Sequence, residues 1–137
     1  MRDINKIILH CSATPEDRKV TVEEIDKWHK ERGFKSIGYH YVIYLDGSIY
    51  KGREEDEIGS HTIGQNTNSI GICYIGGCDS KMNPKDTRTD AQKESLIMLV
   101  KNLLDKYELT SEDVYGHYQF AAKACPSFKI EDLRKEI

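Results

Sequence analysis

The chain has 137 residues, of which 38% are hydrophobic and 31% are charged, and its formal net charge is −3. This length and composition predict one globular domain with a core of its own. The slightly negative charge argues against a nucleic-acid partner and against attraction to an anionic membrane, and apolar runs such as residues 96–100 are too short to span a bilayer.

A short apolar run at residues 6–11 predicts a strand that is buried on both faces. Polar side chains begin at its end with His10 and Ser12, and the carboxyl ends of strands are where ligands bind in α/β sheets. Cys11 is adjacent to His10, so the two side chains are expected to point to opposite faces. This strand end is therefore a candidate site.

The first predicted helix covers about residues 22–32. Thr21 and Glu24 have the spacing of a capping box, in which each side chain bonds the other residue's backbone N–H. Gly33 supplies the stop. The apolar face of this helix recurs at helical spacing through Val22, Ile25 and Trp28.

A β-hairpin is predicted around Asp46-Gly47, because this dipeptide lies between two runs of strand-forming residues. We interpret His40 as a structural histidine held by hydrogen bonds. Strict alternation predicts one face with Tyr39, Tyr41 and Ile43, and the opposite face with His40, Val42 and Tyr44.

A long polar connection at residues 54–68 follows the hairpin, and connections of this length in small domains are usually functional. After it, hydrophobic patterning defines four more elements. These are a strand at 69–75, a helix that begins at a Thr89–Gln92 capping box, a short strand at 113–116 and a closing helix near 130–136.

The four cysteines are not expected to form disulfides, because the first residues of the chain lack the organisation of an export signal. Cys11 and Cys73 lie in predicted strands and are expected to be small buried side chains. Cys78 follows two glycines in a predicted turn and has no expected role. Cys125, beside Pro126 in a polar loop, is the cysteine expected to act as a metal ligand.

His117 and Cys125 are separated by seven residues, and imidazole and thiolate are the side chains that zinc prefers. Two ligands do not hold zinc, so a third must come from another part of the chain. His10 is the best candidate, because His10 and His117 each end a predicted strand. Three protein ligands leave the fourth tetrahedral position to water, which is typical of a catalytic zinc site.

Several short segments, in this order and at these spacings, also identify a family resemblance. They are residues 8–14 (ILHCSAT), 28–31 (WHKE), 38–43 with 46–47 and 52–53, 59–61, 68–72 with 76–77, Thr89 with Gln92, and 116–117 with 123–128 (KACPSF). On these segments the chain resembles the N-acetylmuramoyl-L-alanine amidases of the phage-lysozyme type, which share a family with the peptidoglycan recognition proteins. The resemblance covers nearly the whole chain.

The resemblance implies a Zn²⁺ ion bound by His10, His117 and Cys125, the same three residues. It implies that Tyr39 is the active-site tyrosine and that Lys123 stabilises the negative charge that develops on the substrate oxygen. A neutral phenol is a poor base near its reference pKa of about 10, which favours a water-positioning role for Tyr39. Without the resemblance, Tyr39 would be an ordinary hairpin aromatic and Lys123 a solvated loop charge.

The resemblance also implies the substrate, which is the amide bond between the lactyl group of N-acetylmuramic acid and L-alanine of the peptidoglycan stem peptide. His61 is expected to line the substrate cleft near the metal, and Asn66 to hydrogen-bond glycan or peptide. Many family members carry an acidic residue two positions after the second histidine ligand, where this chain has Gln119. A carboxylate partner near the ligands is therefore missing.

Two functions of other classes compete with this one. A non-catalytic peptidoglycan-binding module on the same fold would lack the ligand cysteine or the tyrosine, whereas Cys125 and Tyr39 are both present. A zinc-stabilised structural domain would need a fourth protein ligand, and none is well placed. The residues favour the zinc amidase.

We therefore expect one α/β amidase domain over residues 1–137, with a central mixed β-sheet flanked by helices on both faces, as in peptidoglycan recognition proteins. The expected partner is muramyl-peptide, and the chain is expected to be a monomer without a nucleic-acid partner or membrane insertion. With no export signal, it is expected to be made in the cytoplasm and to act at the cell wall, as a phage or prophage endolysin does after holin-type release. A cell-wall turnover amidase is the alternative.

Overall fold

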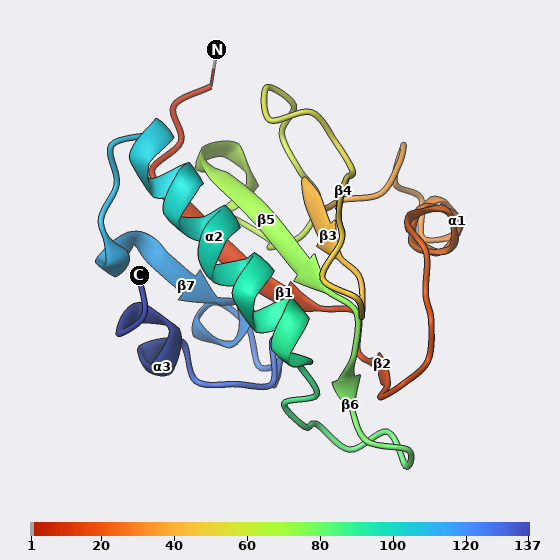
Figure 1. Ribbon diagram of the computed structural model, residues 1–137. Helices are drawn as coiled ribbons and strands as arrows, with labels where there is room; N and C mark the ends of the chain where they lie inside the picture. Colours follow the sequence, from red (N-terminus) through yellow and green to blue (C-terminus); the bar gives the residue numbers. More distant parts are fainter. Residues whose placement is uncertain (1) are drawn as a thin grey trace.

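The first strand of the chain lies inside the sheet rather than at its edge (Figure 1). The structure, a computed structural model, describes residues 2–137. The main sheet has five strands in the order β4-β3-β5-β1-β7, and only the β3–β4 pair is antiparallel. Its strands are β1 (Lys6–Cys11), β3 (Tyr41–Ile43), β4 (Ile49–Lys51), β5 (Ser69–Tyr74) and β7 (Val114–Gly116).

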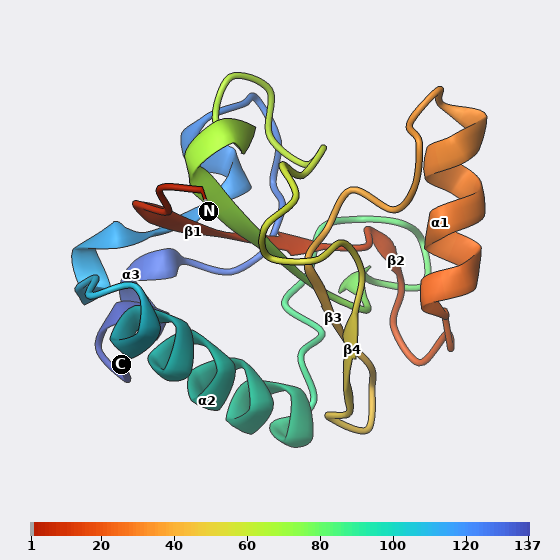
Figure 2. The same ribbon diagram turned by 90° about the horizontal axis from the view of Figure 1, so that it is seen from above.

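Helices cover both faces of this mixed sheet, as predicted. Figure 2 shows α2 and α3 together on one side and α1 on the other. Within residues 2–137, none of the helices combines the length and apolar character needed to cross a membrane. The helices are α1 (Val22–Glu31), α2 (Asp90–Lys106) and α3 (Ile130–Arg134), with one-turn 3-10 helices η1 (Asn66–Asn68), η2 (Ser111–Asp113) and η3 (His117–Gln119).

The larger hydrophobic core lies between the sheet and α2 and α3. Ile7, Leu9 and Cys11 of β1 belong to this cluster, together with side chains of both helices. Because side chains alternate along a strand, His10 points to the opposite face of the sheet. A smaller cluster on that face contains Ile25 of α1 and Val42 of β3. The fold therefore places His10 on the face of the sheet that carries the smaller hydrophobic cluster.

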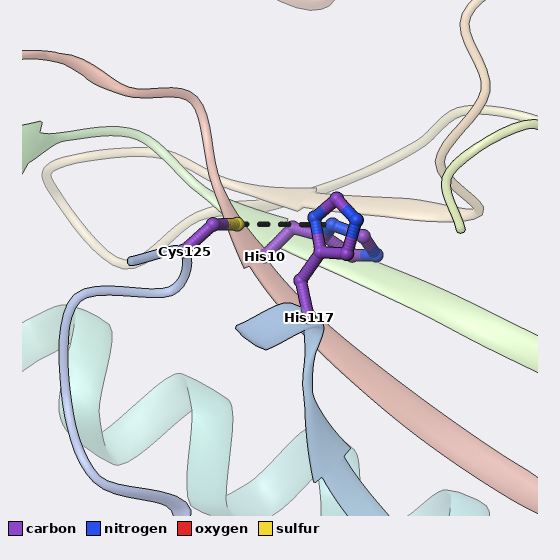
Figure 3. A group of neighbouring side chains, drawn as sticks. All are labelled: His10, His117 and Cys125. Carbon is purple, nitrogen blue, oxygen red and sulfur yellow. Dashed lines mark hydrogen bonds between the residues drawn. The ribbon is translucent and has the colours of Figure 1, made fainter. Parts of the chain in front are cut away.

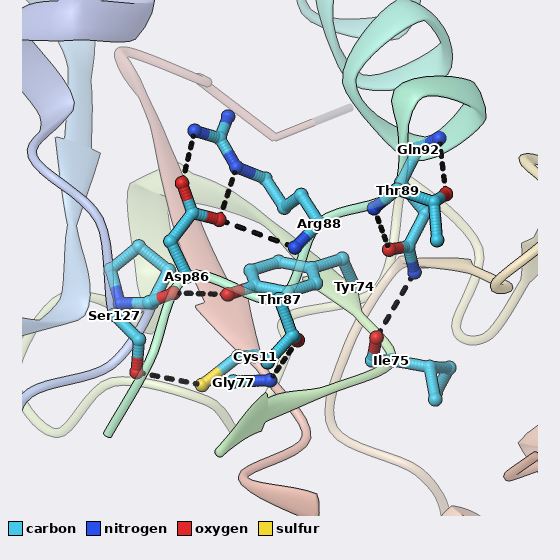
Figure 4. Close-up of polar contacts among 11 residues, drawn as sticks. Cys11, Tyr74, Ile75, Gly77, Asp86, Thr87, Arg88, Thr89, Gln92 and Ser127 are labelled. Atoms are coloured by element: carbon cyan, nitrogen blue, oxygen red, sulfur yellow. Dashed lines mark hydrogen bonds and ion pairs between the residues drawn. The ribbon is translucent and has the colours of Figure 1, made fainter. Parts of the chain in front are cut away.

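Both predicted capping boxes are present. In the first, Thr21 Oγ1 accepts a hydrogen bond from the Glu24 N–H at 3.2 Å, and the Glu24 carboxylate accepts one from the Thr21 N–H. In the second, Thr89 and Gln92 bond each other's backbone N–H groups in the same way (Figure 4). These contacts explain why α1 and α2 begin where the sequence predicts.

The predicted hairpin forms, but the predicted alternation is wrong for Tyr39. β3 begins only at Tyr41, and the residues before it are irregular. Tyr41 packs against the larger core, whereas Tyr39 packs against the smaller cluster with Val42 and Tyr44. Strand alternation applies only where the backbone is extended, so it does not reach back to Tyr39.

A second, two-stranded sheet was not predicted. β2 (Thr14–Pro15) and β6 (Gly77–Cys78) pair in parallel. Each has two residues, which is too short to show a hydrophobic period. Cys78, expected in a turn, is instead a buried strand residue. This small sheet links the segment after β1 to the segment after β5.

Candidate metal centre

His10 and His117 are brought together by the parallel pairing of β1 with β7. Leu9 pairs with Gly116 in this register. The residues that follow them, His10 in β1 and His117 directly after β7, therefore lie at the same end of the sheet. Their ring centroids are 4.6 Å apart. His10 is buried and His117 is half-buried. Two histidines that are far apart in sequence are thus neighbours in the fold.

Cys125 completes the group from the loop after η3. The Cys125 carbonyl accepts a hydrogen bond from the Tyr118 N–H at 2.9 Å, which folds the loop back on itself. The Cys125 Sγ lies 3.8 Å from His10 Nδ1 (Figure 3). Within residues 2–137, His10, His117 and Cys125 are the one group of three or more side chains placed to hold a metal ion together, and their ligand atoms all lie within 4.8 Å of one another.

The chemistry and spacing of these three donors fit a zinc ion. Zinc–ligand distances of about 2.0–2.3 Å in a tetrahedron place ligand atoms roughly 3.5 Å apart, close to the 3.8 Å between Cys125 and His10. Burial lowers the pKa of His10 well below its usual value, and nearby His61, His117 and Lys123 lower it further. Burial, then Lys123, also lowers the pKa of His117. Both imidazoles are therefore neutral at pH 7, as metal binding requires.

The Cys11 backbone adds a contact that the sequence did not reveal. Its N–H donates to Cys125 Sγ at 3.1 Å, and such a bond stabilises a thiolate. The Cys125 thiol lowers the pKa of Cys11 to about 7, whereas the Cys11 thiol and burial raise the pKa of Cys125. A divalent cation bound beside Cys125 would instead lower the pKa of Cys125, because a metal ion binds the thiolate form.

Tyr39 lies against His10, with ring centroids 5.1 Å apart. His29 supports the Tyr39 segment, because its Nδ1 accepts a hydrogen bond from the Gly38 N–H at 2.8 Å. Burial raises the pKa of Tyr39 well above its usual value, and nearby cysteines, led by Cys73, raise it further. The phenol therefore stays protonated and is a hydrogen-bond donor rather than a base.

Lys123 is exposed on the loop that carries Cys125. Burial is the main reason that the pKa values of His10 and His117 are lowered, and the charge of Lys123 lowers both further. Lys123 is therefore close enough to influence the three-residue group. Lys123 also lines an open groove of about 780 Å³. The other residues along the groove include Pro84, Tyr118, Phe128 and Lys129.

His61 is next to the three residues, but it is buried rather than open to a cleft. Its Nδ1 lies 2.9 Å from His10 Nε2, and its Nε2 lies 3.2 Å from Ser69 Oγ. The Asn66 side-chain oxygen accepts hydrogen bonds from the backbone N–H groups of His61 and Thr62. Asn66 therefore shapes the loop that holds His61 in place.

Gln119 performs a local task at the position where many family members are acidic. Its Oε1 accepts a hydrogen bond from the Gly116 N–H at 2.9 Å, which caps η3 directly before His117. An amide oxygen fills this acceptor role as a carboxylate would. The substitution therefore preserves the backbone that presents His117.

The fold is similar to those of solved peptidoglycan amidases and recognition proteins. N-acetylmuramoyl-L-alanine amidase LysC from Clostridium intestinale superposes with a TM-score of 0.85 at 34% identity, over 98% of this chain and 85% of that one. Drosophila PGRP-LB superposes with a TM-score of 0.77 at 26% identity, over 92% of this chain and 76% of that one. The predicted fold class is confirmed.

Sequence comparison gives the family. The endolysin of Escherichia phage T7 is 46% identical over 91% of this chain and 82% of its own length, and the endolysin of Klebsiella phage KP32 is 42% identical over 95% and 85%. The family model described as N-acetylmuramoyl-L-alanine amidase matches residues 1–128. The chain belongs to the N-acetylmuramoyl-L-alanine amidase family, as the sequence segments predicted.

Proposed function

We propose that this chain is a zinc-dependent endolysin that hydrolyses the amide bond between N-acetylmuramic acid and L-alanine in peptidoglycan, and that residues 1–137 form one amidase domain. The observation that carries the proposal is the convergence of His10 with His117 and Cys125, from two distant parts of the chain, with their ligand atoms within 4.8 Å of one another. The identities of 42% and 46% to phage endolysins support the endolysin role over wall turnover.

The metal ligands, Tyr39 and Lys123 have different roles in the proposed reaction. A zinc ion held by His10, His117 and Cys125 would supply Lewis-acid chemistry that activates water at neutral pH. Tyr39, beside His10 and kept protonated by burial, donates a hydrogen bond that orients the reacting groups. Lys123 supplies a positive charge for the oxygen of the scissile carbonyl, a contribution typically worth about a hundredfold or more in turnover.

The surroundings suit a long polar substrate. The groove along Lys123 offers lysines and aromatic rings to the part of the muramyl-peptide beyond the scissile bond. The predicted substrate contacts of His61 and Asn66 stay predictions. In the structure, both side chains form hydrogen bonds within the protein. A monomer that acts at the cell wall after synthesis in the cytoplasm is part of the same proposal.

The test uses purified protein and bacterial sacculi, with release of free stem peptide as the readout. We expect release by the zinc-loaded protein, loss of release with a chelator, and recovery when zinc is restored. Binding to sacculi without release by the zinc-loaded protein would instead identify a peptidoglycan-binding module.

Cys125→Ser tests the ligand assignment directly. We expect this variant to lose bound zinc and at least a hundredfold in activity, because zinc binds serine poorly in place of a thiolate. Cys78→Ser is the matched control, since Cys78 is buried in β6 outside the site, and it should keep both properties. Unchanged zinc content in Cys125→Ser would refute the assignment.

A further inference from the structure

His10 uses its two ring nitrogens in different directions. Its Nδ1 faces Cys125, at 3.8 Å from the sulfur, and its Nε2 faces His61, at 2.9 Å from Nδ1 of that ring. His10 is 1% exposed and His61 is 9% exposed. A contact this short between two buried rings is a hydrogen bond shielded from water, so one nitrogen donates and the other accepts.

Two glycines make the space that holds the His61 ring against His10. A Cβ at Gly71 of β5 would lie 2.6 Å from two ring carbons of His61, and a Cβ at Gly59 would lie 2.7 Å from one of them. Any other residue at either position would push the ring away. The backbone on both sides therefore leaves room for an aromatic ring in this place.

The second nitrogen of His61 has a partner of its own. Its Nε2 lies 3.2 Å from the hydroxyl of Ser69, which is fully buried. The Thr62 hydroxyl lies 3.3 Å from His10 Nε2 and 3.0 Å from His61 Nδ1, beside the same contact. One consistent assignment has His10 Nε2–H donating to His61 Nδ1, and His61 Nε2–H donating to Ser69.

We propose that His61 is a positioning residue that accepts the Nε2–H of His10 and thereby keeps the Nδ1 lone pair of His10 directed at the metal. This inference rests on the proposed zinc site and assigns His61 a role that acts through a ligand rather than through the substrate. Partners of this kind fix the tautomer and orientation of a ligand histidine, and their removal typically weakens metal binding about tenfold to a hundredfold.

The first test needs no metal. Nitrogen-15 NMR of the imidazoles in metal-free protein reports which nitrogen of each histidine carries the proton. We expect His10 to be protonated at Nε2 and His61 to be unprotonated at Nδ1. The opposite tautomer of His10 would overturn the proposal, even if the protein proves to bind zinc. Failure of the protein to bind zinc would instead overturn the proposed function.

The second test compares two variants at position 61 by their zinc affinity, measured by competition with a chromogenic chelator. His61→Phe keeps an aromatic ring in the glycine-lined space but removes the acceptor, so we expect about tenfold to a hundredfold weaker binding. His61→Gln offers an amide oxygen as acceptor and should recover part of the loss. Wild-type affinity in His61→Phe, or equal losses in both variants, would refute the hydrogen-bonding role.

Gly71→Ala gives an independent check, because it removes no polar group. Its new methyl group would displace the His61 ring, so zinc affinity should fall as in His61→Phe. A melting curve of each metal-free variant separates this effect from misfolding. A Gly71→Ala protein that folds, keeps wild-type zinc affinity and retains the His10 tautomer would contradict the proposal.

Discussion

A single side chain, Gln92, connects three parts of the structure. Its Oε1 caps α2 by accepting from the Thr89 N–H at 2.9 Å, and its Nε2 donates to the carbonyl oxygen of Ile75 at 3.0 Å (Figure 4). The same Nε2 donates to the carbonyl oxygen of Ile43 at 3.3 Å. Gln92 is fully buried. Its amide therefore satisfies backbone groups at the ends of β3 and β5 that water does not reach.

We expect Gln92→Leu to lower the free energy of unfolding by about 3 kcal/mol. The change leaves the Ile75 carbonyl without its donor, whereas the Ile43 carbonyl keeps the Ile75 N–H. It also removes half of a capping box, so the cost is about 1–3 kcal/mol for the unpaired buried group and about 1 kcal/mol for the cap. Urea unfolding measures the loss. The neighbouring exposed Lys93→Ala should stay within about 0.5 kcal/mol of wild type. A similar stability for both variants would show that the Gln92 contacts contribute little.

At the scale of elements, Glu55 fastens the end of α2 to the hairpin. Its carboxylate accepts hydrogen bonds from the hydroxyls of Tyr41 in β3 and Tyr107 at the end of α2, and it pairs with Lys106 at 2.8 Å. Burial alone would raise the pKa of Glu55, but the bonds from Lys106, Tyr107 and Tyr41 outweigh it and lower the pKa to about 2. The ionised carboxylate is the form that holds these elements together.

This contact predicts a defined pH dependence. The folded-state pKa of Glu55 lies below its usual value of 4.5, so its stabilising effect is complete above pH 4.5 and is lost as pH falls towards 2. We expect Glu55→Gln to be less stable than wild type at pH 7 and to approach it at pH 2–3 in thermal melts. Glu54→Gln, at a largely exposed position paired with Lys51, is the control. A constant gap between Glu55→Gln and wild type would contradict the ionic role.

At the scale of the molecule, the candidate metal centre joins the first strand of the chain to its last strand and to the loop that follows. β1 supplies His10, the end of β7 supplies His117, and Cys125 lies eight residues further on. A ligand that binds only the folded chain stabilises it by mass action. Bound zinc should therefore stabilise the whole folded sheet, in addition to its role in the proposed reaction.

We expect a chelator to lower the melting temperature of the zinc-loaded protein by on the order of 10 °C. Metal at about a hundred times its dissociation constant contributes about 2.7 kcal/mol, and a domain of this size shifts by roughly 3–6 °C per kcal/mol. Differential scanning fluorimetry measures the shift. Cys125→Ser should show no response to the chelator. An identical melting temperature with and without chelator in the wild-type protein would argue against a zinc site at this place.

Local chemistry made much of this structure predictable. The capping boxes at Thr21 and Thr89 fixed the starts of α1 and α2, and the Asp46-Gly47 dipeptide located the hairpin. Zinc-binding side chains at two strand ends were enough to select His10, His117 and Cys125, which the structure brings together. In each case the deciding information lies within a few residues of sequence or in the nature of the side chain.

Contacts between distant segments were not predictable in the same way. The face of Tyr39 depends on where β3 begins, which pairing with β5 decides. The approach of His61 to His10 depends on glycines at positions 59 and 71, and the Cys11 N–H reaches Cys125 across 114 residues. No period or motif encodes such contacts, since they arise only when the sheet is assembled.

The central place of β1 has a consequence for the nascent chain. Residues 6–11 leave the ribosome before their two neighbours in the sheet, which are residues 69–74 and 114–116. Pairing over such long stretches comes late in folding. Residues 6–11 therefore keep one edge unpaired until residues 114–116 have been translated, and metal binding by the nascent chain should appear abruptly after that point rather than grow with chain length.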